Sequence, residues 1–120
     1  MAGFTRLEEA ARHAIFAETP GLAPMLEQQF ERASVISREN TGAGRFTTIG
    51  TSGDVPQVDT SRVLGHETCA RVEGLACGLG FVLFLEKGRP HLLEGYDLGG
   101  DSTARLDLEN LAFVITGDPR

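Results

Sequence analysis

The residues of this sequence that could together form a chemical site are polar side chains at the ends of two apolar stretches. Arg38 and Glu39 follow the first stretch, and Glu94, Tyr96 and Asp97 follow the second. If both ends meet at one rim of a sheet, the guanidinium, the carboxylates and the phenol form a small polar cluster. Two glutamates can act as general acid and base when desolvation raises the pKa of one of them. A surface Arg–Glu pair and an aromatic ring over a sheet edge would explain the same residues without a ligand.

The chain is acidic: its 120 residues include 11 Lys and Arg against 17 Asp and Glu, a formal net charge of −6. This balance argues against nucleic acid as a partner, because holding phosphates needs a basic surface. The acids are densest over residues 94–109, which include Asp101. We expect this stretch to meet a basic protein, since complementary charge raises the association rate. The same net charge would also simply keep a small domain soluble.

Metal, cofactor and cysteine chemistry are not expected. His66, Cys69 and Cys77 give only one short ligand pair, whereas a zinc site needs four convergent ligands, usually in paired short spacings. Free cysteines are usually small core residues, and we expect that of both cysteines here. The glycine pairs at 42–44 and 78–80 do not lie between a strand and a helix, as a phosphate loop requires. We predict no metal site and no cofactor.

Length and patterning favour one domain spanning residues 1–120, which should bury roughly 65% of its unfolded surface. No apolar run reaches the ~18 to 20 residues that a bilayer span needs. The first residues lack the basic and apolar segments of a secretory signal. Two cysteines do not make a disulfide framework in a domain of this size. We therefore expect a reduced, cytoplasmic protein without a membrane partner.

Two helices are expected first, over residues 5–18 and 23–33. In the first, apolar residues recur at helical spacing, and Thr5 followed by Glu8 has the spacing of a capping box. In the second, Pro24 fits the first turn, where its missing N–H costs nothing. Gln29 interrupts the apolar face of that helix, and we expect it to point to the edge of the core.

From residue 34 to 116 the apolar pattern changes to the period of strands. Residues 79–85 and 111–115 are apolar on both faces, which is typical of strands covered on both sides. Two helices followed by short strands predict an α+β fold, with the helices packed on a largely antiparallel sheet of five to six strands. Helices on one face would leave apolar side chains on the other, to be buried by the loop over residues 50–66, by a second copy in a homodimer, or by a partner.

Three segments resemble those of a family of small, uncharacterised bacterial proteins. They read R-E-x-T-G-x-G at residues 38–44, G-x-G-F-x-L-F at 78–84 and L-E-G-Y at 93–96. The resemblance covers roughly residues 33–97. It implies a shared fold and no assigned activity.

Three hypotheses for function follow. The first is a non-catalytic binding protein, such as an acidic immunity or inhibitor protein for a basic, nucleic-acid-acting partner. The second is a small-molecule-binding domain or enzyme that uses Arg38, Glu39, Glu94 and Tyr96 at the sheet rim. The third is a homodimer that buries the uncovered sheet face, which is compatible with either of the others.

Overall fold

The computed structural model describes residues 3–51, 57–60 and 62–116. They form two helices and then seven strands, which confirms the predicted α+β class. The elements are α1 (Arg6–Ala17), α2 (Ala23–Glu31), β1 (Ala33–Asn40), β2 (Gly44–Thr51), β3 (Val63–Leu64), β4 (Cys69–Val72), β5 (Leu79–Glu86), β6 (Arg89–Asp97) and β7 (Phe113–Thr116).

The start of α1 is fixed by the predicted capping box. The amide of Glu8 donates to Thr5 Oγ1 over 3.1 Å, and the amide of Thr5 donates to a Glu8 carboxylate oxygen over 2.8 Å. Both donors would otherwise lack a partner within the helix. Proline at the first turn of α2 also fits its predicted place, although α2 ends two residues before the predicted limit of residue 33.

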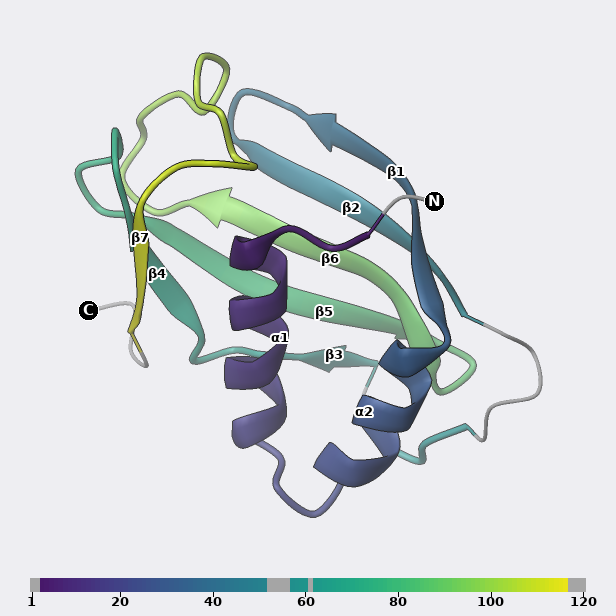
Figure 1. The fold of residues 1–120 in the computed structure, drawn as a ribbon. Helices are drawn as coiled ribbons and strands as arrows, with labels where there is room; N and C mark the ends of the chain where they lie inside the picture. The colour runs from purple at the N-terminus through teal and green to yellow at the C-terminus, as the bar shows by residue number, and fades with distance from the viewer. Residues whose placement is uncertain (1–2, 52–56, 61, 117–120) are drawn as a thin grey trace.

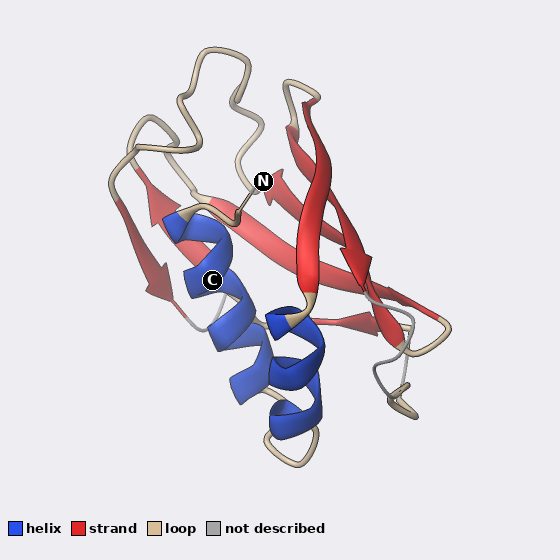
Figure 2. Cartoon of the chain, turned by 45° about the vertical axis from the view of Figure 1, so that its right-hand side comes forward, coloured by secondary structure: helices blue, strands red, loops and turns tan. Residues whose placement is uncertain are grey.

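All strand pairs are antiparallel, and the sheet runs in the order β1-β2-β6-β5-β4-β7. The short β3 pairs with β5 beside β4. The sheet curves around the helices, as Figure 2 shows, and β1 and β7 form its two edges.

Both helices lie on one face of the sheet (Figure 1), which we call the inner face; the opposite side is the outer face. Side chains that alternate along the strands divide between the two faces. One inner cross-strand row, in register from β1 to β3, consists of Arg38, Thr47, Leu93, Leu83 and Leu64. The core fills the space between this face, the helices and the segment over residues 98–112, which contributes the buried Leu108.

The sheet has seven strands where five to six were predicted, and three further details differ from the sequence-based expectation. Gln29 is fully buried, not at the core edge, because its amide nitrogen donates to the carbonyl of Gly88 over 2.8 Å. The last strand is not covered on both faces, because β7 is an edge strand with Val114 64% exposed. The expected loop over residues 50–66 contains the end of β2 and the short β3, and residues 52–56 and 61 of it lie outside the described residues.

Among the described residues, no helix has the length and apolar character needed to cross a membrane.

Candidate functional site

Arg38 is a structural residue of the inner face. Its Nε and Nη2 donate to the two carboxylate oxygens of Glu8 over 2.9 and 2.7 Å, and Nη2 also donates to the Gly3 carbonyl. The hydroxyl of Thr47 donates to Glu8 over 2.7 Å. Glu8 is only 5% exposed, so this fork of charged hydrogen bonds joins α1 to β1 and β2 inside the protein. Arg38 therefore does not join Glu39 in a polar cluster.

The Glu8 carboxylate titrates below its ordinary range. Burial by itself raises the pKa of Glu8, but the hydrogen bonds from Arg38, Thr47 and the Thr5 amide outweigh burial and lower the pKa overall. The pKa of Arg38 is raised, first by its hydrogen bonds to Glu8. Both shifts favour the charged pair.

This lowered pKa predicts acid sensitivity. The pKa of Glu8 in the folded chain lies below its value in the unfolded chain, about 4.3. Its contribution to stability is therefore complete above that value and is lost as the pH falls through the folded pKa. The stability difference between the wild type and Glu8→Gln, measured by urea unfolding from pH 7 to pH 3, should narrow as the pH falls. Parallel stability curves would contradict this.

The outer face is organised in three cross-strand rows. We call the central one, which runs Glu39, Phe46, Glu94 and Val82 across β1, β2, β6 and β5, the acidic row. The row on one side of it contains Ser37, Thr48, Leu92, Phe84 and Val63. The row on the other side contains Gly44, Tyr96, Gly80, Cys69 and Thr116. Among the described residues no helix covers these rows (Figures 1 and 2).

Three predicted site residues, Glu39, Glu94 and Tyr96, share this outer face. Glu39 is exposed and Glu94 is half-buried, and within the described part of the chain neither side chain makes a hydrogen bond or an ion pair. The ring of Tyr96 lies over Gly80, where an added Cβ would come within 2.5 Å of Tyr96 Cζ. The side chain of Tyr96 is thus placed by packing, whereas the two glutamates keep unpaired charges.

A groove of ≈ 600 Å³ opens beside the acidic row. Apolar side chains of four strands line it, together with Glu94. At its other end lie Arg62, Glu86 and His91, with 3.5 Å between His91 Nε2 and Glu86 Oε2. The groove is therefore apolar along its length and charged at both ends. Its volume falls within the range of roughly 300 to 1,000 Å³ that is typical of ligand-binding clefts.

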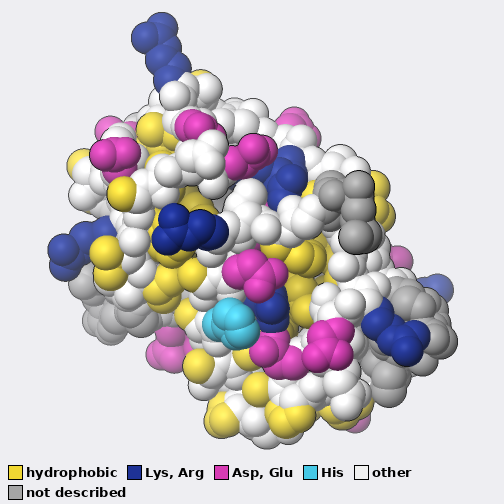
Figure 3. Space-filling view, viewed as in Figure 1, with side chains coloured by type: hydrophobic (Ala, Val, Ile, Leu, Met, Phe, Trp, Pro, Cys, Tyr) yellow, Lys and Arg dark blue, Asp and Glu magenta, His cyan; other side chains and the backbone are white. Residues whose placement is uncertain are grey.

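On the inner side, a hollow of ≈ 330 Å³ that Arg38, Arg45 and residues 106–109 line is smaller than the groove. The hollow between α1 and the sheet holds ≈ 20 Å³. That is room for about one water molecule. On this helix-covered face acidic and basic side chains lie next to one another (Figure 3).

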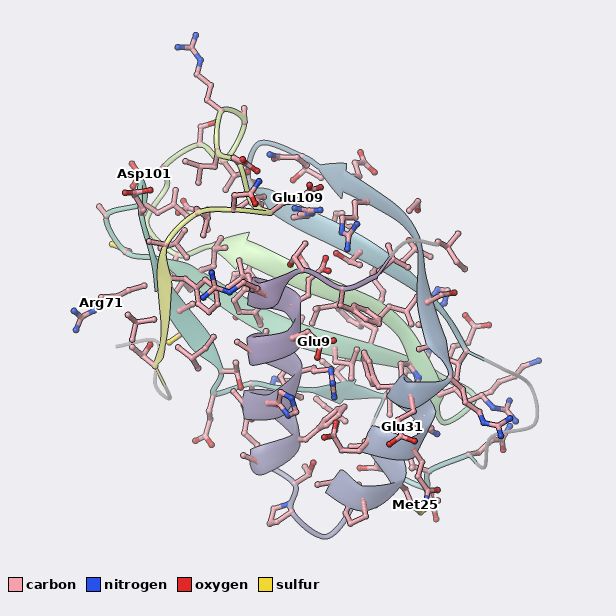
Figure 4. All side chains as sticks on the ribbon, viewed as in Figure 1. Glu9, Met25, Glu31, Arg71, Asp101 and Glu109 are labelled. Atoms are coloured by element: carbon pink, nitrogen blue, oxygen red, sulfur yellow. The ribbon has the colours of Figure 1, made fainter. Side chains whose placement is uncertain are left out.

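The acidic residues over 94–109 do not form one surface. Those in β6 point alternately to the two faces of the sheet, and those that follow lie in a separate segment beyond the strand. Asp97 lies on the inner side of β6, two residues beyond Gly95. Asp101 accepts a hydrogen bond from the Ala76 amide over 2.9 Å, and Glu109 lies 3.4 Å from Arg45. Figure 4 shows Asp101 and Glu109 on separate arms of the segment above the sheet. Of the acidic residues of β6, Glu94 points to the outer face.

Two of the three segments that resemble those of small bacterial proteins, residues 38–44 and 93–96, owe most of their residues to the fold. In residues 38–44, Asn40 accepts a hydrogen bond from Thr103 Oγ1 over 2.8 Å, Gly42 has a φ of 89°, and Gly44 lies against the backbone of β6. In residues 93–96, Leu93 is in the core and Gly95 makes room for the Phe81 ring. Glu39 and Glu94 are the charged members whose side chains make no hydrogen bond or ion pair with the described residues.

Sequence reasoning missed Glu8, Thr47 and Phe46. The capping role of Glu8 already explains its place in the sequence, so nothing in the sequence predicts that it also pairs with Arg38. Thr47 and Phe46 are neighbours in β2, and only the register with β1 and β6 shows which face each one occupies. Phe46 completes the outer surface because it lies between the two unpaired glutamates.

No metal site was predicted, and no group of three or more His, Cys, Asp or Glu side chains in the described residues is arranged to hold a metal ion. Cys69 is buried as expected. Cys77 is exposed, contrary to expectation, because it lies in the turn between β4 and β5 against Gly99 rather than in a strand.

The chain matches no family model, and it has no significant match among curated proteins or solved structures. The resemblance of residues 33–97 to small bacterial proteins therefore stays a prediction.

Proposed function

We propose that this chain is a non-catalytic binding protein whose outer face docks a basic protein. The class of function that this fits is an inhibitor or immunity protein, which covers a cationic surface of its partner. Complementary charge would speed association and orient the two proteins. The cytoplasm is the proposed compartment, supported by two free thiols at Cys69 and Cys77.

The acidic row carries this proposal. Glu39 and Glu94 are held in one row on either side of Phe46, on a face that no described helix covers. Arg38 is next to Glu39 in sequence, but its side chain forms an ion pair with Glu8 inside the protein and does not neutralise Glu39. The acidic row therefore keeps its negative charge available to a partner, beside an apolar groove that a partner could desolvate.

The alternative of an enzyme at the sheet rim has less support. That hypothesis needs the guanidinium of Arg38 beside Glu39, Glu94 and Tyr96, and the structure places it on the opposite face. A homodimer through the outer face would bring the unpaired glutamates of two acidic chains together, so a separate basic partner is the better-supported occupant.

Charge reversal tests the proposal. Glu39→Lys/Glu94→Lys should weaken binding of the basic partner captured from the source cells by at least about tenfold. Glu31→Lys/Glu73→Lys is the matched control, because it changes the net charge equally at two exposed positions, Glu31 being on α2 (Figure 4). Binding is measured by titrating the purified partner into this chain and recording the fluorescence emission of Tyr96. This residue is the one tyrosine of a chain without tryptophan.

The proposal also predicts that binding weakens as salt is raised, because salt screens exposed charges. Equal losses in the two double variants would mean that only net charge matters and would overturn the placement on the outer face. A partner that binds both variants as tightly as the wild type would overturn the proposal as a whole.

A further inference from the structure

The chain already contains one arginine held by an aromatic ring and two carboxylates. The guanidinium of Arg12 lies 5.2 Å from the centre of the Phe30 ring. Arg12 Nη2 donates to Glu9 over 2.7 Å, and Nη1 donates to Glu27. The side chain of Arg12 is only 15% exposed in this setting. A guanidinium fits this arrangement of ring and carboxylates because the flat face of the group stacks on a ring while its N–H groups donate to carboxylates.

The outer face carries the same three groups without a cation. Phe46 lies directly between Glu39 and Glu94 in neighbouring strands. Side chains directly opposite each other across an antiparallel pair have Cβ atoms about 5 Å apart. Each carboxylate can therefore reach a cation placed on the Phe46 ring. Within the described residues no arginine or lysine occupies that ring.

We propose that the acidic row binds an arginine side chain of the basic partner, stacked on Phe46 and hydrogen-bonded to Glu94 and Glu39. This inference rests on the proposed function and names what the outer face recognises. Arginine is favoured over lysine because guanidinium can stack on the ring and bond a carboxylate in two parallel hydrogen bonds, whereas an ammonium is a compact, strongly hydrated charge.

The groove beside the acidic row supports an arginine that is part of a chain segment. Phe84 and Leu92 line it next to Phe46 and Glu94. Apolar residues that flank the arginine in the partner can pack there and exclude water from the ion pair. Arg62 and Glu86 lie together at the far end of the groove, so that end carries no net negative charge to attract further basic residues of the segment. The fitting segment is one arginine with apolar neighbours.

Two short peptides test the arginine directly. An acetylated and amidated peptide Gly-Leu-Arg-Leu-Gly and its lysine counterpart are titrated into the ¹⁵N-labelled chain and followed by NMR. The arginine peptide should shift the amides of Phe46 and Glu94 and bind about threefold more tightly than the lysine peptide. Phe46→Leu should remove this preference. Phe84→Leu removes a ring from the groove but not from the acidic row, so it should weaken both peptides alike and keep the preference for arginine.

The outcomes separate this inference from the function on which it rests. Both peptides could bind equally at the outer face, with Glu39→Lys/Glu94→Lys weakening both. That result would support the docking of a basic partner and would contradict the assignment of an arginine. Shifts confined to the helix-covered face would overturn both. Concentration-dependent shifts at Phe46 without peptide, lost in Arg62→Gln, would show that a second copy supplies the arginine and would overturn the assignment to a separate partner.

Discussion

Replacing Arg38 by methionine is expected to lower the free energy of unfolding by about 3 to 5 kcal/mol. The Arg38 side chain is 20% exposed and that of Glu8 is 7% exposed, so the charge left behind on Glu8 has little access to water. Breaking one side of a buried ion pair is costly because the other charge stays buried, and here Glu8 keeps only its hydrogen bonds from Thr47 and the Thr5 amide. Urea unfolding at neutral pH, followed by circular dichroism, measures this loss.

Two further variants show whether the loss comes from the unpaired carboxylate. Glu8→Leu/Arg38→Met removes both charges and should recover a large part of the stability, since a buried pair can often be replaced by apolar residues at small cost. Arg45→Met also removes a largely buried arginine, but its partner Glu109 is 58% exposed and 3.4 Å away, so its loss should be below about 1 kcal/mol. Equal losses in Arg38→Met and Arg45→Met would contradict the structural role of Arg38.

The fold class could be predicted from the sequence because its signals are local. The capping residues and the helical spacing mark α1, and the change to a period of two marks the strands. The strand order could not be predicted, because β2 pairs with β6, more than forty residues away in the chain. Such pairing depends on long-range packing that no short segment encodes. The burial of Gln29 was missed for the same reason, since its partner Gly88 is 59 residues away.

Part of the candidate site could be predicted from the sequence. Successive side chains of a strand point to opposite faces, so Arg38 and Glu39 had to separate, as did Tyr96 and Asp97. The alternation within each strand thus predicts which of these residues can share a face. The register between strands, which places Phe46 between the two glutamates, came only from the structure.

Replacing Gly44 by alanine should destabilise the chain by about 3 kcal/mol or more, since overpacking costs rise when nothing can move aside. A Cβ at this position would lie 2.1 Å from the carbonyl oxygen of Gly95 and 2.8 Å from Tyr96 Cα. These are backbone atoms of the neighbouring strand, so the clash can be relieved only by moving β2 away from β6. Urea unfolding measures the loss.

The same displacement links this glycine to the outer face. Phe46 and Glu94 are paired two residues further along the same two strands, so a shift at Gly44 disturbs the acidic row. Gly44→Ala should therefore also weaken binding of the arginine peptide under conditions where the variant is still folded. Gly21→Ala is the matched control, since nothing lies within 4 Å of an added Cβ there, and it should change neither stability nor binding. Wild-type stability of Gly44→Ala would show that β2 and β6 do not approach this closely, and the acidic row would then lose its fixed geometry.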